Sequence, residues 1–202
     1  MRAAATPGRR RVFTRRPSRY PRILPRLFIF DPPALENPAR AILRRLPSLS
    51  GAPILIQRAR GLRDRHGAVH AGSFLRERRI AFDCSSAELP RIFAHELFHF
   101  VWLRLGNAVR RSYEDLLSAE RRAGARGELG WSAEWRKRRL QPRDIESRSR
   151  RWREYCCESF CDAAAWLYSG LRRHREYTLA PRFRARRRAW FARSIEQRIL
   201  SI

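Results

Sequence analysis

Long apolar runs and cysteine are both scarce in this 202-residue sequence. No apolar stretch approaches the roughly 18 residues that a membrane-spanning helix needs, so we expect no transmembrane segment. Four cysteines are too few and too clustered for a disulfide scaffold, and buried thiols in a reducing cytosol are the simplest interpretation. Three of them, Cys156, Cys157 and Cys161, lie together, but they do not favour a second metal site because no Cys-x-x-Cys spacing occurs.

Acidic residues are scarce as well: 19 stand against 45 basic residues, which gives a formal net charge of +26. All but one of the basic residues are arginine, and the single lysine is Lys137. Such a charge attracts nucleic acid or an acidic partner to Arg-rich tails, although no aromatic-basic recognition module accompanies it. The arginine bias is equally typical of translation from a GC-rich genome, so charge alone does not assign a function.

The 44% apolar fraction and the six tryptophans favour one folded domain over general disorder. Residues 1–25 carry repeated arginines and four prolines, which predicts a disordered basic arm. They lack the uninterrupted apolar region of a signal peptide, so a cytoplasmic location is expected. Residues 26–180 are expected to form the folded domain, and 181–202 a basic amphipathic helix that packs on it by its apolar side.

Short apolar runs in the first half predict the strands of a small sheet. Two such runs lie at 27–30 and 54–56, and the segment 51–83 is expected to contain two or three strands. A short helix is expected over 39–46. A longer helix is expected to start between Ser86 and Pro90 and to stop at Gly106 and the residue after it. It is hydrophobic on every side, which is typical of a buried helix.

This buried helix carries the run His95-Glu96-Leu97-Phe98-His99. Side chains four residues apart lie on the same face of a helix, so His95 and His99 can bind one metal ion while Glu96 stands beside it as a general base. Polar groups inside an apolar helix also need a reason to be buried. The alternative is two core histidines satisfied by hydrogen bonds, with Glu96 paired to an arginine.

A catalytic zinc ion takes three protein ligands, and the third is expected on a helix that runs from 142 or 144 to 169. Within it, Glu154, Glu158 and Asp162 recur every fourth residue and form one acidic stripe among apolar and small residues. Carboxylates among apolar residues need a positively charged partner, and a metal ion can be that partner. An exposed face paired with arginines is the alternative.

The segment between these two helices has two interpretations. A helix is expected over 112–123, and three glycines then break it. Trp131 and Trp135 follow beside small residues. They are typical either of a loop packed over the core or of a lid that contacts substrate near the site.

The first motif, followed by a helix with Glu-x-x-x-Asp, resembles the gluzincin zinc metallopeptidases. The strand before the motif is similar to the small ImmA/IrrE-like members of that group. The resemblance implies that His95, His99 and Glu158 bind Zn²⁺, that Glu96 is the catalytic base, and that Asp162 orients a ligand histidine from behind. It also implies a peptide or protein substrate.

The resemblance covers about residues 70–170 and has two departures. Phe98 stands before His99, where many small members have a glycine. No residue is assigned to stabilise the oxyanion, for which the candidates are Tyr168, His174 and Tyr177.

The third ligand has two alternatives to Glu158. Glu154 could bind the metal with Glu158 behind it. SprT-like DNA-associated proteases use a third histidine, and His174 is the only one after His99, but it lies beyond the stop at Gly170.

We therefore expect an α+β fold, with a small β-sheet packed on the active-site helix and a mostly helical C-terminal half. The resemblance implies that residues 26–180 form a zincin-like metallopeptidase domain. The expected function is hydrolysis of peptide bonds by a zinc-activated water, with Glu96 as general base. The competing expectation is a regulatory or nucleic-acid-binding protein on a peptidase fold, with weak or absent hydrolysis.

Overall fold

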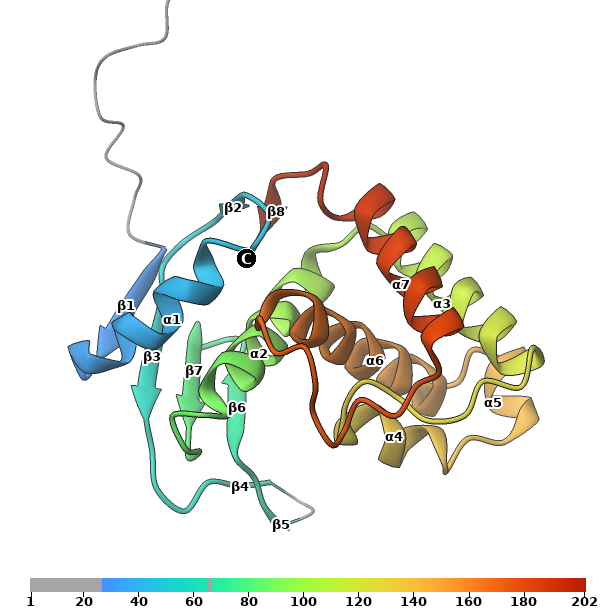
Figure 1. Cartoon of the computed structure of the whole chain (residues 1–202), viewed down its shortest axis with the longest axis horizontal. Coiled ribbons are helices and arrows are strands. Elements are labelled where there is room, and N and C mark those ends of the chain that lie inside the picture. The colour runs from blue at the N-terminus through green and yellow to red at the C-terminus, as the bar shows by residue number, and fades with distance from the viewer. Residues whose placement is uncertain (1–26, 65–66) are drawn as a thin grey trace, which may run out of the picture.

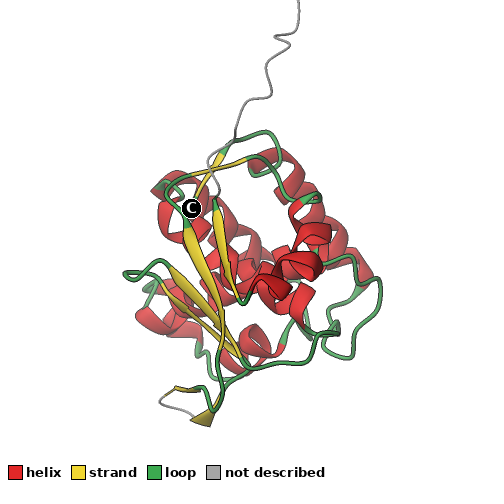
Figure 2. Cartoon of the chain, turned by 90° about the vertical axis from the view of Figure 1, so that its left-hand side faces the viewer, coloured by secondary structure: helices red, strands yellow, loops and turns green. Residues whose placement is uncertain are grey.

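The computed structural model describes residues 27–64 and 67–202 and shows an α+β architecture. A four-stranded sheet stands at one side of the molecule, with helices beside and behind it (Figure 1 and Figure 2). The expected α+β class is therefore confirmed. The predicted basic arm, residues 1–25, lies outside the described residues.

Most strands lie in the first half of the chain, and helices dominate the second half. The strands are β1 (Phe28–Asp31), β2 (Leu49–Ser50), β3 (Ile54–Arg58), β4 (Arg63–Asp64), β5 (Gly67–Ala68), β6 (Ala71–Phe74), β7 (Arg79–Phe82) and β8 (Leu200–Ser201). The helices are the 3-10 helix η1 (Pro33–Leu35) and α1 (Glu36–Leu43), α2 (Leu89–Arg104), α3 (Asn107–Arg122), α4 (Trp131–Lys137), α5 (Pro142–Glu146), α6 (Arg150–Tyr168) and α7 (Pro181–Ser194).

The main sheet has the strand order β1-β3-β7-β6, so β6 is an end strand. β1, β3 and β7 are parallel to one another, and β6 runs antiparallel to β7. Ile54 and Ile56 of β3 and Ile80 of β7 are buried, as short apolar strands in a covered sheet should be. The strands predicted at 27–30 and 54–56 are confirmed.

α2 is buried along almost its whole length, which confirms the prediction made from its apolar residues. It begins at Leu89, with Pro90 in its first turn, and ends at Arg104. It packs against β6 and β7 on one side and most extensively against α6 on the other. Within the described ranges, neither α2 nor another helix combines the length and apolarity needed to cross a membrane.

Phe98 belongs to an aromatic core between α2, α6 and α7. Its ring centroid lies 5.6 Å from that of Phe160, 5.4 Å from that of Tyr168 and 6.4 Å from that of Phe191. A glycine at this position would leave a cavity among these rings. The departure from the pattern of the small ImmA/IrrE-like members therefore has a packing reason.

The helix predicted from 142 or 144 to 169 is two helices. α5 ends at Glu146, and α6 begins after Ser149, whose hydroxyl accepts from the Trp152 N–H and caps the new helix. The helix predicted over 112–123 also starts earlier, because α3 begins at Asn107. Capping by Ser149 is the local signal that the sequence interpretation missed.

The helix predicted over 181–202 is too long, because α7 ends at Ser194. The last residues form β8, which pairs in parallel with β2 and returns the C-terminus to the N-terminal half (Figure 1). The Leu200 N–H donates to the Ser48 carbonyl, and the Ile202 N–H donates to the Ser50 carbonyl. Sheet pairing with a distant segment thus replaces the helical hydrogen bonds.

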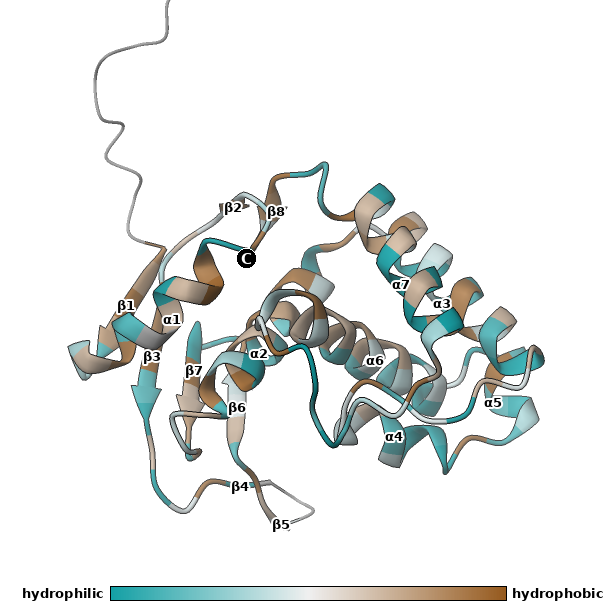
Figure 3. Ribbon diagram, in the orientation of Figure 1, coloured by the Kyte–Doolittle hydropathy of each residue, from teal (hydrophilic) through white to brown (hydrophobic). Residues whose placement is uncertain are grey.

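α7 was expected to keep its arginines in solvent. Figure 3 shows hydrophilic residues along the helix, but Arg187 is fully buried. Its Nε lies 3.0 Å from Glu120 Oε2, and its Nη1 lies 2.6 Å from Glu128 Oε2. Lys137 and Tyr155 also contact Glu128, and we call these five residues the Arg187 cluster. α7 is therefore anchored by buried ion pairs, which corrects the expectation of a fully solvated arginine face.

Candidate metal centre

Three side chains from two helices meet in a cleft: His95 and His99 of α2 and Glu158 of α6. His95 Nε2 lies 3.2 Å from His99 Nε2 and 3.3 Å from Glu158 Oε2, and His99 Nε2 lies 3.9 Å from Glu158 Oε2. Ligand atoms around a tetrahedral zinc ion lie about 3.3 Å apart, as its bond lengths of about 2.0–2.1 Å dictate. The three atoms are thus close to the arrangement that one zinc ion requires. We call these residues the His–Glu site.

Asp162 stands behind the first histidine. Its Oδ1 lies 2.8 Å from His95 Nδ1, and a carboxylate can only accept, so Nδ1 carries the proton and Nε2 is left to face the other donors. Its Oδ2 accepts from the Ala133 N–H at 3.0 Å. A Cβ on Gly130 would lie 2.2 Å from this carboxylate, so only glycine permits the close approach of α4. Asp162 is therefore positioned to orient His95.

The two oxygens of Glu158 have different partners. Oε2 faces the histidines, and Oε1 accepts from Arg136 Nη2 at 3.0 Å. Burial raises the pKa of Glu158, but the hydrogen bond with His95 and the nearby positive charges outweigh it and lower the pKa to about 2. Arg136 was not identified from the sequence, where no spacing distinguishes it from the other arginines.

The formal charges of the site are unbalanced. Glu96, Glu158 and Asp162 are three carboxylates, and Arg136 is the one arginine or lysine among the described residues that forms an ion pair with any of them. With neutral imidazoles, two negative charges remain in excess, and burying such charges without a partner is costly. Without an ion, protons fill this role: burial lowers the pKa of His95, but the Asp162 carboxylate raises it well above the usual value. A divalent ion supplies the same two positive charges.

Glu96 lies beside the three donors and is held by the sheet. The Ser73 hydroxyl of β6 lies 2.5 Å from Glu96 Oε2 and 2.8 Å from the Glu96 carbonyl oxygen. The end strand therefore positions the carboxylate that the sequence assigns as general base. Sequence reasoning missed Ser73, because a small polar residue on a strand has no periodic relation to a helix 23 residues later.

The site opens into a cleft of about 1440 Å³. β6 lines one part of it, and Trp131 and Trp135 line another. Trp131 is 58% exposed. The segment predicted as a packed loop or a lid is thus helix α4, and both of its tryptophans line the cleft.

The alternative third ligands lie elsewhere. Glu154 is bound by Arg150 at 2.8 Å on the outer side of α6 and does not belong to the group of converging donors. His174 Nε2 lies 3.1 Å from Glu88 Oε1 and is likewise separate from that group. The arrangement therefore favours Glu158.

The structure does not bring the oxyanion candidates to the cleft. Tyr168 and Tyr177 are buried side chains, and neither they nor His174 line the cleft among the described residues. Arg136 does line it. None of the three candidates is therefore supported by its position.

Comparisons with protein-family models, with curated proteins and with solved structures find nothing that matches this chain. The resemblance to gluzincin and ImmA/IrrE-like peptidases therefore stays a prediction from the motifs. The geometry supports a metal centre independently of it, because two imidazoles and one carboxylate converge in a partly buried position with excess negative charge. These donor types suit zinc.

Proposed function

We propose that this protein is a zinc-dependent metallopeptidase. The observation that carries the proposal is the convergence of His95 Nε2, His99 Nε2 and Glu158 Oε2 in a cleft, with Glu96 beside them. Zinc bound there would lower the pKa of a water molecule and polarise a peptide carbonyl.

The residues of the chain would position the ligands and move the proton. Glu96 takes a proton from the attacking water and passes it to the leaving amine. Ser73 keeps the Glu96 carboxylate in place, Asp162 holds the His95 ring, and Arg136 holds Glu158 by its second oxygen. Each of these three contacts fixes the geometry before substrate arrives, which is what efficient proton transfer requires.

The peptide is expected to lie along β6. This strand ends the main sheet and lines the cleft next to Glu96. An extended peptide can add to such a strand through main-chain hydrogen bonds. Arg126, Arg175 and Arg182 also line the cleft, and none of them has an ion-pair partner among the described residues. This charge favours peptides that carry acidic residues.

Replacement of the general base tests the reaction. Glu96→Gln should keep one zinc ion per chain and lose peptide cleavage by about 10²–10⁴-fold, the usual contribution of a general base. Zinc is measured by elemental analysis of protein purified without chelator, and cleavage with an unstructured peptide library. Glu154→Gln, on the outer side of α6, serves as the matched control and should retain both. Protein without zinc, or equal cleavage by Glu96→Gln and wild type, would overturn the proposal.

The third ligand is tested by a pair of variants on the same helix. Glu158→Gln should lose tight zinc binding, because it replaces a negatively charged carboxylate with a neutral amide whose oxygen is a much weaker ligand. Glu154→Gln should retain it. The opposite result would assign the ligand to Glu154.

The competing function is a regulatory or nucleic-acid-binding protein, and the net charge of +26 is the observation that favours it. It predicts a salt-dependent shift of DNA in a gel that persists in Glu96→Gln. Absence of binding, or binding that does not respond to salt, would contradict it. A cytoplasmic location stays a prediction in either case.

A further inference from the structure

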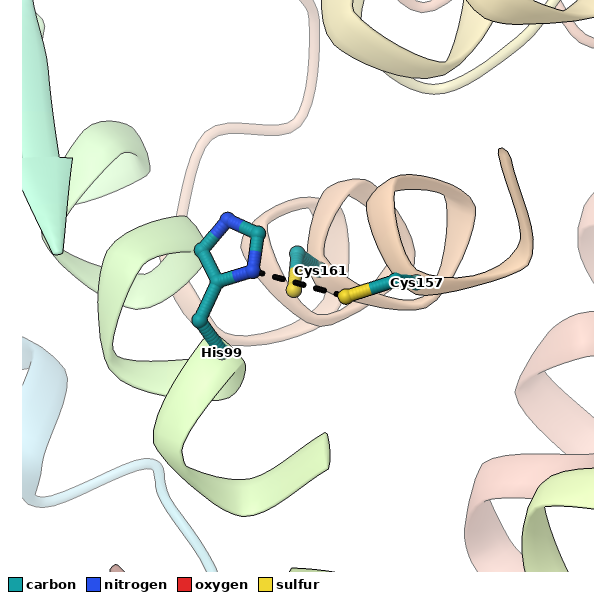
Figure 4. A group of neighbouring side chains, drawn as sticks. All are labelled: His99, Cys157 and Cys161. Carbon is teal, nitrogen blue, oxygen red and sulfur yellow. Dashed lines mark hydrogen bonds between the residues drawn. The ribbon is translucent and has the colours of Figure 1, made fainter. Parts of the chain in front are cut away.

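Cys157 and Cys161 lie one helical turn apart on α6, beside the His–Glu site. Their sulfur atoms and Nδ1 of His99 all lie within 4.8 Å of one another. The Cys157 sulfur is 3.5 Å from His99 Nδ1. Figure 4 shows one ring nitrogen of His99 facing the two sulfurs and the other facing away.

These separations fit a single ion. A tetrahedral ion with a metal–sulfur bond of about 2.3 Å and a metal–nitrogen bond of about 2.0–2.1 Å holds such a pair about 3.6 Å apart. That value matches the measured separation of the Cys157 sulfur and His99 Nδ1. A spacing of four residues on a helix therefore brings two thiols to one ion, as a Cys-x-x-Cys spacing does in a turn.

The position of His99 couples this group to the His–Glu site. Its Nε2 faces His95 and Glu158, and its Nδ1 faces the thiols. A neutral imidazole has one nitrogen with a free lone pair and one with a proton. It can therefore serve as ligand on one side only at a given moment.

We propose that Cys157, Cys161 and His99 Nδ1 form a second, thiol-rich metal site for a soft divalent ion, and that its occupation withdraws His99 from the His–Glu site. The withdrawal rests on the proposed function, whereas the thiol site itself does not. With zinc at the His–Glu site, the proton on His99 Nδ1 would face the Cys157 sulfur and would help to hold the ring. Coordination of an ion by Nδ1 would release that proton to water, and Nε2, which would take up a proton as zinc leaves it, would no longer be a zinc ligand.

Charge and donor type indicate which ions fit. Two thiolates and a divalent ion are neutral together, which suits the buried Cys161 and the half-buried Cys157. Sulfur donors favour zinc or cadmium over magnesium or calcium. A metal also ionises the thiols that bind it, so the burial of Cys161 does not prevent coordination. An excess of zinc-like ions would therefore fill the thiol site and inhibit the proposed peptidase by withdrawing His99.

Cadmium alone is the probe for the thiol site. Metal-free full-length protein is titrated with Cd²⁺ while the cadmium–thiolate absorption in the ultraviolet is recorded. Wild type, Glu158→Gln and the control Cys84→Ser should all show this absorption. Cys157→Ser and Cys161→Ala should each show at most about half of this absorption and bind cadmium at least about tenfold more weakly, because removal of a ligand costs at least as much as loss of its hydrogen-bond partner. No thiolate absorption in wild type, or undiminished absorption in Cys157→Ser, would overturn the thiol site.

Circular dichroism identifies a variant that fails to fold. If Cys161→Ala does so, Cys157→Ser decides, because its side chain is only half-buried. Dialysis equilibrium then tests the withdrawal of His99: zinc-loaded wild type treated with Cd²⁺ should retain one ion per chain, and a stable second ion would overturn it. Glu158→Gln lacks a complete His–Glu site, so its cadmium absorption reports the thiol site alone. Failure of wild type to bind zinc would therefore contradict the proposed function without affecting the test of the thiol site.

Discussion

Two buried charged clusters share helices α4 and α6, and only one of them is internally neutral. The Arg187 cluster sets Arg187 and Lys137 against Glu120 and Glu128. The His–Glu site and its surroundings set three carboxylates against one guanidinium. A buried cluster whose positive and negative charges balance needs no further ion. A cluster with an excess of carboxylates needs a positive charge from outside. The comparison therefore separates a structural cluster from the one that we propose binds an ion.

One face of α6 serves both clusters. Tyr155 donates to Glu128 Oε1 at 2.6 Å, and Glu158 and Asp162 follow three and seven residues later on the same face. α4 likewise contributes one cation to each cluster. Because the two clusters share helices, the experiments that distinguish them must measure folding stability and ion binding separately.

Removal of the central cation of the neutral cluster should have the largest effect. Arg187→Ala leaves Glu120 and Glu128 buried without their main partner, and we expect the free energy of unfolding to fall by about 3–5 kcal/mol. Urea unfolding measures this. Arg186→Ala, an exposed neighbour on α7, is the matched control and should change stability by at most about 0.5 kcal/mol. Equal free energies of unfolding for the two variants would show that Arg187 does not stabilise the cluster.

Acid should weaken the same cluster through Glu128. Burial raises the pKa of Glu128, but the charges of Arg187 and Lys137 outweigh it and lower the pKa to about 2, below the ordinary 4.5. The carboxylate thus contributes stability that is present above about pH 4.5 and lost as the pH falls towards 2, about 3 kcal/mol in all. Glu120 acts in the opposite direction, because burial raises its pKa and Arg187 only partly offsets this.

Comparison with Glu128→Gln isolates this contribution. The difference in unfolding free energy between wild type and Glu128→Gln should shrink as the pH falls from about 5 to about 2, since only wild type then gains a proton at this position. Guanidinium unfolding across this range is the measurement. A difference that stays constant with pH would show that Glu128 is not held ionised by the cluster.

In the His–Glu site, removal of a charge should affect ion binding more than folding. Asp162→Asn keeps an oxygen for the Ala133 N–H but places a neutral group behind His95. We expect zinc affinity to fall by about 10–100-fold, the usual effect of losing the partner of a ligand histidine. Competition with a chromophoric chelator measures the affinity, and urea unfolding of metal-free protein measures the stability. Unchanged zinc affinity, with Glu154→Gln as control, would contradict the role of Asp162.

Periodicity explains which parts of the site were predictable. His95 and His99 share a face because they are four residues apart, and the acidic stripe of α6 follows the same rule. Glu158 could then be singled out only by resemblance. Its choice over Glu154 depends on how α6 packs against α2, which is a tertiary property.

Features that depend on distant contacts were not predictable. The apolar pattern continues beyond α7, but pairing of β8 with β2 turns the last residues into a strand. Arg187 has no local feature that distinguishes it from the other arginines of α7, yet it is the one buried in an ion cluster. The thiols were set aside because the expected spacing was that of a turn, although a helix brings Cys157 and Cys161 together equally well.

Replacement of Ser73 should have the smallest effect, because Ser73 contacts Glu96, the proposed general base, without altering the charge of either cluster. Ser73→Ala removes the hydrogen bond to Glu96 Oε2, and we expect kcat to fall about tenfold, since a hydrogen bond to a charged group contributes about 1.5 kcal/mol. Ser73→Thr keeps a hydroxyl and should restore most of the rate. Zinc affinity should stay unchanged and KM should change little in both variants, because the zinc ligands are untouched and a peptide along β6 would bind through main-chain groups that both substitutions keep. A purely structural role of Ser73 in β6 would instead lower stability and raise KM, with no rescue by threonine. Loss of zinc from Ser73→Ala would show that Glu96 and its support belong to ion binding rather than to proton transfer.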